Sequence, residues 1–207
     1  MNIGATSETD YGNYYQYGKG AAQYAATNSD SNYSGTEDPL NSSVDTAAQV
    51  WGGSWHMPTR AQIQELTANT TYQWVTNYKG SGIDGGTFTA TNGAVLFLPA
   101  AGNWGNVSLY NVGNFGYYWG SSPYTSTLAY YLRFSLSIND VSNFNRKYGY
   151  SVRPVLNSTN TISLKDKVLQ LEQSLATVAT TGSYNDLLDL PTNISSFTND
   201  VGYLISH

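Results

Sequence analysis

Cysteine is absent from the 207-residue chain, and charged residues make up only 11% of it. Without cysteine the chain can form no disulfide, no thiolate metal site and no cysteine nucleophile. The formal net charge is −5, so the phosphates of a nucleic acid would be repelled rather than neutralised. These shortages argue against thiol chemistry and against a nucleic-acid partner.

Long apolar runs are missing as well. No stretch approaches the roughly 18 consecutive apolar residues of a membrane-spanning helix. Residues 1–25 have no basic start followed by an apolar core, so we expect neither a signal peptide nor membrane insertion. The chain has instead 18 tyrosines, 5 tryptophans and 20 glycines. This composition favours short strands and long ordered loops over helices.

Two short helices are predicted in the first half of the chain. Thr59 stands in the N-cap position of residues 59–69, and Gln62 completes a capping box. A weaker helical pattern covers residues 43–52. Aromatic and β-branched residues predict strands at residues 94–100, 117–122, 128–136 and 148–156.

The apolar content of these segments predicts the core. The continuous apolar run 94–100 is typical of a buried central strand. Alternation along 128–136 puts Tyr131, Arg133 and Ser135 on one face and the leucines on the other. The large apolar residues expected in the core are Trp51, Trp55, Leu96, Leu98, Trp119, Val152 and Val155.

The C-terminal fifty residues differ in character. Residues 158–179 carry apolar residues alternately four and three positions apart, which is a heptad seam: Leu164, Val168, Leu171, Leu175 and Val178. A helix of about fifteen residues is marginal alone, so we expect the seam to pair with copies of itself, as a dimer or a trimer. Residues 180–207 are polar with isolated apolar residues, and are expected to wrap around such an oligomer.

Several segments occur in an order that resembles a known family. They are NIGATSETDYGNYYQYG (2–18), WGGSWHMPTRAQIQEL (51–66), LFLPAAGNWG (96–105) with GYYWGSS (116–122), and YGYSVRPV (148–155). The pattern is similar to a paralogous domain of Fibrobacter and Bacteroides-group bacteria and their phages, a version of the C-type lectin-like fold. The tail, with SYNDL, LPT and SSFTNDVGYL, resembles a repeat of phage tail fibres.

The resemblance implies an α+β chain with three parts. Residues 1–157 would be a C-type lectin-like domain of short helices and antiparallel strands, residues 158–179 a coiled-coil stalk, and residues 180–207 a fibre repeat. The whole would be a phage receptor-binding or tail-fibre protein on the virion, a trimer that joins further fibre components. Because the repeat reads as unfinished at His207, we expect either an attachment beyond the C-terminus or a truncated chain.

Two segments have the composition of a binding surface. Tyrosine and tryptophan give large contact areas at low entropic cost, and serine, glycine and asparagine give adaptable hydrogen bonds. These residue types predominate in residues 103–118 and 135–149, which we expect to be loops that meet on one face. The predicted ligand-binding residues are Asn103, Trp104, Asn106, Ser108, Tyr110, Asn111, Phe115, Arg133, Ser135, Asn139, Asn143, Asn145 and Tyr148. The expected ligand is a glycan or protein of a bacterial surface.

Other functions are open but less supported. Formylglycine-generating enzymes share the fold but need cysteines, and His56 sits in a packing motif, so we expect no enzyme. Calcium stays an alternative, although only IND (138–140) echoes a C-type lectin calcium motif, and we expect no cofactor. Arg153 is expected to hold an ion pair or a carbonyl. The competing interpretation is a structural fibre or capsid-decoration module, or a bacterial adhesin.

Overall fold

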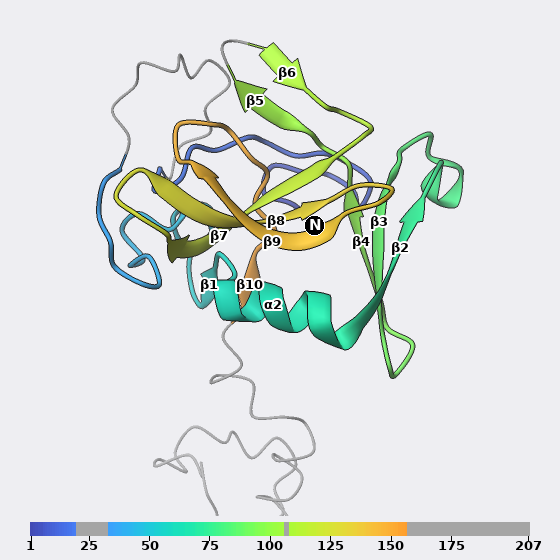
Figure 1. Cartoon of the computed structure of the whole chain (residues 1–207), viewed down its shortest axis with the longest axis horizontal. Helices are drawn as coiled ribbons and strands as arrows, with labels where there is room; N and C mark the ends of the chain where they lie inside the picture. Colours follow the sequence, from blue (N-terminus) through green and yellow to red (C-terminus); the bar gives the residue numbers. More distant parts are fainter. Residues whose placement is uncertain (20–32, 106–107, 157–207) are drawn as a thin grey trace, which may run out of the picture. The chain divides into compact units, whose positions relative to one another are not determined.

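The computed structural model describes residues 1–19, 33–105 and 108–156. These residues fall in one compact unit, Met1–Asn157, and the second unit of the chain is Ser158–His207. The described part is an α+β domain of short helices and antiparallel strands, as expected (Figure 1). The predicted heptad seam, Leu164 to Val178, and the predicted tail repeat lie outside the described residues.

Two three-stranded antiparallel sheets dominate the described residues. The first has the order β2–β3–β4, formed by β2 (Thr70–Val75), β3 (Gly85–Ala90) and β4 (Val95–Pro99). The second has the order β7–β8–β9, formed by β7 (Gly116–Pro123), β8 (Leu128–Phe134) and β9 (Asn139–Asn145). Smaller pairs are β1 (Trp55–His56) with β10 (Val155–Leu156), and β5 (Asn103–Gly105) with β6 (Ser108–Tyr110). A 3-10 turn, η1 (Tyr78–Gly80), follows β2.

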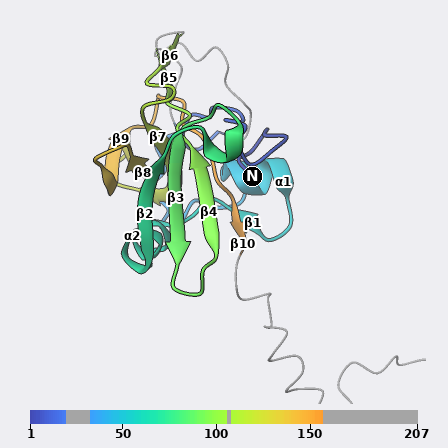
Figure 2. The same ribbon diagram turned by 90° about the vertical axis from the view of Figure 1, so that its right-hand side faces the viewer.

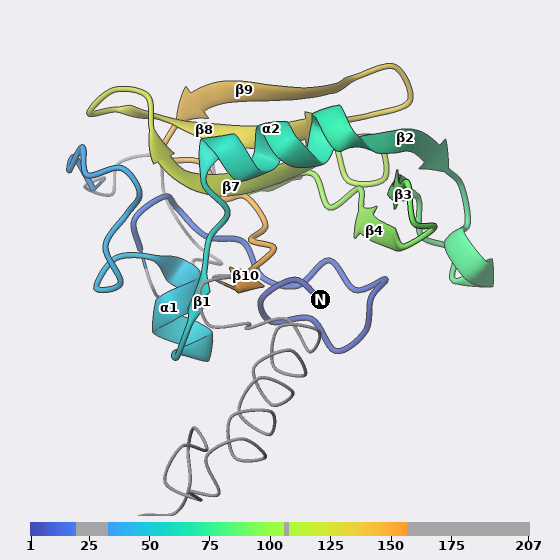
Figure 3. The same cartoon turned by 90° about the horizontal axis from the view of Figure 1, so that it is seen from below.

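Helix α2 (Arg60–Asn69) forms where the capping box predicts it. The Thr59 hydroxyl accepts a hydrogen bond from the Gln62 amide at 3.2 Å, and the Gln62 side chain accepts one from the Thr59 amide at 2.9 Å. The helix lies across one face of the β7–β8–β9 sheet (Figure 3). Ile63 is its fully buried anchor, packed among residues of that sheet.

Helix α1 (Thr46–Trp51) is capped by a buried carboxylate. Asp45 accepts hydrogen bonds from the amides of Ala47 and Ala48, and also from the amide of Met57 at 2.9 Å. One side chain therefore starts the helix and ties it to the strand region that follows. The prediction that Trp51 is a core residue is wrong: its side chain is 37% exposed, because the helix buries Ala47 instead.

The β7–β8–β9 sheet separates two hydrophobic clusters. Trp119 and Tyr131 face the first cluster, together with Tyr15 and Tyr150 from the chain ends of the domain. On the other face, Leu132 and Phe134 belong to a second cluster that includes Ile63. Both faces of β8 are therefore covered. The predicted alternation stops at Phe134, since Leu136 lies beyond the strand and is 77% exposed.

The strand predicted to be central is an edge strand. Strand β4 pairs with β3 alone, and β3 occupies the middle of its sheet (Figure 2). The sequence of β3, GGTFTA, has no long apolar run. Its glycines leave room for neighbouring rings. A Cβ at Gly86 would lie 2.7 Å from the Tyr72 ring and 3.1 Å from the Phe134 ring. Strand β3 is thus central because rings from neighbouring segments pack on it, although its own sequence lacks the apolar run that predicts a central strand.

Candidate functional site

A concavity of about 500 Å³ opens between the β5–β6 hairpin and the β7–β8–β9 sheet. We call it the tyrosine concavity, and its lining residues are Asn103, Tyr110, Asn111, Tyr117, Tyr131, Arg133, Phe144, Tyr148 and Tyr150. The hairpin stands out from the domain in two perpendicular views (Figures 1 and 2). Six of these nine side chains are aromatic. The site is therefore built mainly from rings.

The hairpin is held in place by backbone hydrogen bonds. Trp104 and Gly149 exchange two hydrogen bonds of 2.8 Å, which join β5 to the segment that carries Tyr148 and Tyr150. Gly102 turns the chain into β5 with a φ of +63°, and a Cβ there would lie 2.2 Å from the Tyr110 carbonyl oxygen. Only glycine fits that close approach. The position of Tyr110 over the concavity is thus fixed by backbone geometry.

A ladder of rings runs from the core to this surface. The Trp119 ring, fully buried, stacks on Tyr150 with centroids 4.2 Å apart. Tyr150 stacks on Tyr117 at 5.2 Å, and Tyr117 stacks on Phe115 at 5.6 Å with the planes 3° apart. Such contacts add to the free energy of burial and restrict ring motion. The concavity therefore has a rigid aromatic floor.

One ion pair lies at the edge of the floor. Arg133 of β8 stands opposite Asp140 of β9, and its Nε and Nη2 donate to the two carboxylate oxygens at 3.0 and 2.7 Å. The hydrogen bond to Asp140 raises the pKa of Arg133 further above its usual range. The bidentate geometry orients the guanidinium. It also balances the positive charge, so the concavity offers no net cation.

Three phenols of the concavity are held in the neutral form by burial. Burial raises the pKa of Tyr117, Tyr131 and Tyr150 above the ordinary value of 10.0. A neutral phenol both donates and accepts hydrogen bonds. Asn111, which adopts a left-handed conformation with φ of 60°, donates to the Tyr117 hydroxyl at 3.4 Å. The site thus combines ring faces with uncharged hydrogen-bonding groups.

Five of the predicted ligand-binding residues line this concavity. They are Asn103, Tyr110, Asn111, Arg133 and Tyr148.

The other predicted residues of the first segment lie near the hairpin. Phe115 stacks on the lining residue Tyr117, and Ser108 is exposed on β6. Trp104 is half-buried within the hairpin and is not in the lining. Asn106 lies outside the described residues.

The predicted asparagines of the second segment are not brought to the concavity. This segment is strand β9 rather than a loop, and alternate side chains of a strand point to opposite faces. Phe144 lines the concavity, so Asn139, Asn143 and Asn145 fall on the side of α2 and Val141. Ser135 is buried, and its carbonyl oxygen accepts a hydrogen bond from the Tyr72 hydroxyl. These four residues therefore do not line the tyrosine concavity, and their role in ligand binding stays a prediction.

Sequence reasoning missed four lining residues, namely Tyr117, Tyr131, Phe144 and Tyr150. Tyr131 was placed on the face of Arg133 by alternation, and the same alternation in β9 would have selected Phe144. Tyr117 and Tyr150 belong to the predicted strands 117–122 and 148–156, and neither tyrosine was among the predicted ligand-binding residues.

Two acidic residues outside the concavity have side-chain partners. Glu8 pairs with Lys79 at 2.6 Å, and Asp38 accepts a hydrogen bond from Ser122 at 2.6 Å. His56 Nδ1 lies 2.8 Å from the Met57 carbonyl oxygen. Within residues 1–19, 33–105 and 108–156, no three His, Asp or Glu side chains are grouped so that they could hold a metal ion. The same ranges contain no helix long and apolar enough to cross a membrane.

Comparisons of the chain with protein-family models, with curated proteins and with solved structures found no match. The tyrosine concavity is therefore interpreted from its own geometry.

Proposed function

We propose that residues 1–157 form a C-type lectin-like binding domain of a phage receptor-binding or tail-fibre protein. Its tyrosine concavity would bind a glycan of a bacterial cell surface. The observation that carries the proposal is the rigid aromatic floor, open to solvent and edged by one charge-balanced Arg133–Asp140 pair. No catalytic role is proposed.

Sugar chemistry fits these groups. The flat C–H faces of a pyranose ring pack against aromatic rings, and Tyr110, Tyr117 and Phe144 offer such rings at the surface. Sugar hydroxyls need partners that donate and accept, which neutral phenols and the Asn111 amide provide. Because Arg133 is balanced by Asp140, a neutral sugar fits better than an acidic one. A protein receptor, the alternative ligand, is distinguished by the experiment below.

The virion context rests on the sequence. The heptad seam of residues 158–179 and the fibre-like repeat of residues 180–207 support an oligomeric stalk, which we propose to be trimeric. An oligomer would present several copies of a weak sugar site at once, and multivalent attachment raises the overall affinity without new contacts. A structural fibre module or an adhesin would share the stalk but would not require the open aromatic floor.

Truncating two exposed rings is expected to weaken attachment strongly without unfolding the domain. Tyr110 and Phe144 are 45% and 42% exposed, so Tyr110→Ala with Phe144→Ala removes contact area but little core. We expect at least about a tenfold loss of binding by the labelled full chain to Fibrobacter and Bacteroides-group cells. The matched control is Tyr124→Ala, at a tyrosine that is 52% exposed outside the concavity.

Two treatments of the cells separate the ligand classes. Periodate, which cleaves vicinal diols, is expected to abolish binding, whereas proteinase K is expected to leave it intact. The opposite pattern would point to a protein receptor. Equal binding by the double variant and by the unchanged chain would contradict the concavity as the site, and absence of binding to any strain would favour the structural module.

Chelating calcium is expected to leave attachment unchanged. Both carboxylate oxygens of Asp140, the acid of the IND motif, accept hydrogen bonds from Arg133. A calcium ion needs six to eight oxygen ligands and would have to displace that guanidinium. The measurement is cell binding with EDTA, then with added calcium. A loss that calcium restores would contradict this prediction and revive the calcium alternative.

A further inference from the structure

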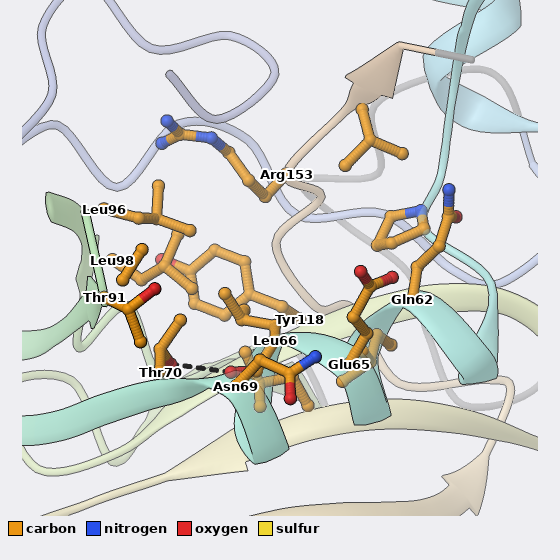
Figure 4. Close-up of a pocket in the computed structure, with 15 residues that line it drawn as sticks. Gln62, Glu65, Leu66, Asn69, Thr70, Thr91, Leu96, Leu98, Tyr118 and Arg153 are labelled. Atoms are coloured by element: carbon orange, nitrogen blue, oxygen red, sulfur yellow. Dashed lines mark hydrogen bonds between the residues drawn. The ribbon is translucent and has the colours of Figure 1, made fainter. Parts of the chain in front are cut away.

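A second, mainly apolar pocket of about 460 Å³ lies on the other side of the β7–β8–β9 sheet (Figure 4). Helix α2 forms one side of the pocket, with Leu66 facing inward, and β4 contributes Leu96 and Leu98. The Tyr118 ring lies between these elements. A pocket of this size and composition is typical of sites for small molecules.

Arg153 gives the pocket its one cationic group. Figure 4 shows its side chain crossing the pocket beside Leu96. Nη1 of Arg153 is buried and donates to no acceptor in the part of the chain that the structure describes, so the ion pair or carbonyl contact expected from the sequence is not found there. Burial lowers the pKa of Arg153 from its ordinary value, and the interactions with Tyr118 and Glu8 oppose this only in part. A buried guanidinium nitrogen without an acceptor is costly unless an anion joins it.

The remaining polar groups of the pocket do not meet this need. Glu65 of α2 is an exposed side chain of the lining and forms no ion pair with Arg153. The Tyr118 hydroxyl already donates to the Pro99 carbonyl oxygen at 2.7 Å and accepts from Asn2 at 3.1 Å. The guanidinium is therefore the group at which a ligand head would be recognised.

We propose that this pocket binds a small apolar carboxylate, with the carboxylate on the Arg153 guanidinium and the hydrocarbon body against Leu66, Leu96 and Leu98. The charge of the head complements Arg153, and the lining matches the body. A pocket of about 460 Å³ has room for a chain of about eight carbon atoms. This site lies on the opposite face of the sheet from the tyrosine concavity and does not depend on its function.

The test uses octanoate and its uncharged analogue octanamide as probes, titrated into the full chain by isothermal calorimetry. Octanoate is expected to bind at least about tenfold more tightly than octanamide, since a charge-assisted contact is lost in the amide. In Arg153→Gln the two probes are expected to bind equally, at the weaker value. In Glu65→Gln octanoate is expected to bind a few-fold more tightly at low salt, because a nearby repulsive charge is removed.

A second variant keeps the proposal testable if Arg153→Gln fails to fold. Thr91 is an exposed residue of the lining, so Thr91→Trp is expected to fill the pocket mouth and block both probes. Gln73→Trp, at an exposed position of β2 outside the pocket, is the matched control and should bind as the unchanged chain does. Equal affinity for octanoate and octanamide, octanoate binding that survives Thr91→Trp, or no saturable binding would each overturn the proposal.

Discussion

Replacing Arg146 with alanine is expected to lower the free energy of unfolding by about 4 kcal/mol, a large fraction of the stability of a small domain. The side chain is fully buried. Its guanidinium donates to the carbonyl oxygens of Leu128 at 3.1 Å, Tyr33 at 2.9 Å and Gly35 at 2.8 Å, and also to that of Thr125. Alanine would leave these acceptors without their donor and open a cavity beside them.

The position of Arg146 explains the large expected loss of stability. Its acceptors belong to two regions that are far apart in sequence: residues 33–35, and the β7–β8 turn with the start of β8. The Tyr17 ring lies 4.7 Å from its guanidinium carbon and adds a cation–π contact. Burial lowers the pKa of Arg146, so the carbonyl oxygens are what keep the charge inside the domain.

Urea unfolding of the full chain, followed by circular dichroism at one protein concentration, measures the effect. Arg60→Ala is the matched control, because Arg60 is exposed and lies over the Tyr130 ring at 4.3 Å. It is expected to cost less than about 1 kcal/mol. Arg146→Lys keeps the charge but cannot reach all four carbonyl oxygens, so an intermediate loss is expected. Equal midpoints for Arg146→Ala and Arg60→Ala would contradict the assignment.

Short sequence motifs predicted those elements that are stabilised by contacts between residues close together in the sequence. The capping box of Thr59 and Gln62 determines where α2 begins, and these two residues interact within one turn. Strands β2 and β3 carry no comparable signal. Nothing in the sequence around Gly86 marks it as special, yet the rings of Tyr72 and Phe134 leave no room for a Cβ there. Strands β2 and β3 depend on contacts between segments that are far apart in the sequence, and such contacts cannot be read from one sequence.

The candidate site was predicted in part for the same reason. Composition selected two segments that both contribute residues to the concavity, since a surface of rings and amides has a recognisable composition. It did not select the face, because residues 139–145 form a strand in which Phe144 and Asn143 point in opposite directions. The hydrogen-bond partners of the arginines could not be predicted from the sequence either. Arg146 binds backbone carbonyl oxygens, whereas Arg153 is left facing a pocket.

The domain is expected to unfold cooperatively at alkaline pH, between about pH 11 and 12. Burial raises the pKa of Tyr14, Tyr17, Tyr118 and Tyr150 well above the ordinary value of 10.0. These phenols stay protonated in the folded state, while in the unfolded chain they lose their protons above pH 10. Stability is therefore complete below pH 10 and falls as the pH rises. Each such tyrosine removes about 1.4 kcal/mol per pH unit, so four together remove about 5.5 kcal/mol per pH unit.

Tyrosinate absorbance and far-ultraviolet circular dichroism, recorded together across the titration, test this expectation. The buried tyrosines should ionise only as the secondary structure is lost, in one transition. Tyr150→Phe removes one of these phenols and is expected to move the transition to higher pH, whereas Tyr124→Phe, at an exposed tyrosine, should not move it. Ionisation of every tyrosine near pH 10 with the dichroism unchanged would contradict the burial of these rings. The ladder from Trp119 through Tyr150 to the concavity would then lack its rigid base, because a charged Tyr150 cannot stack within the core.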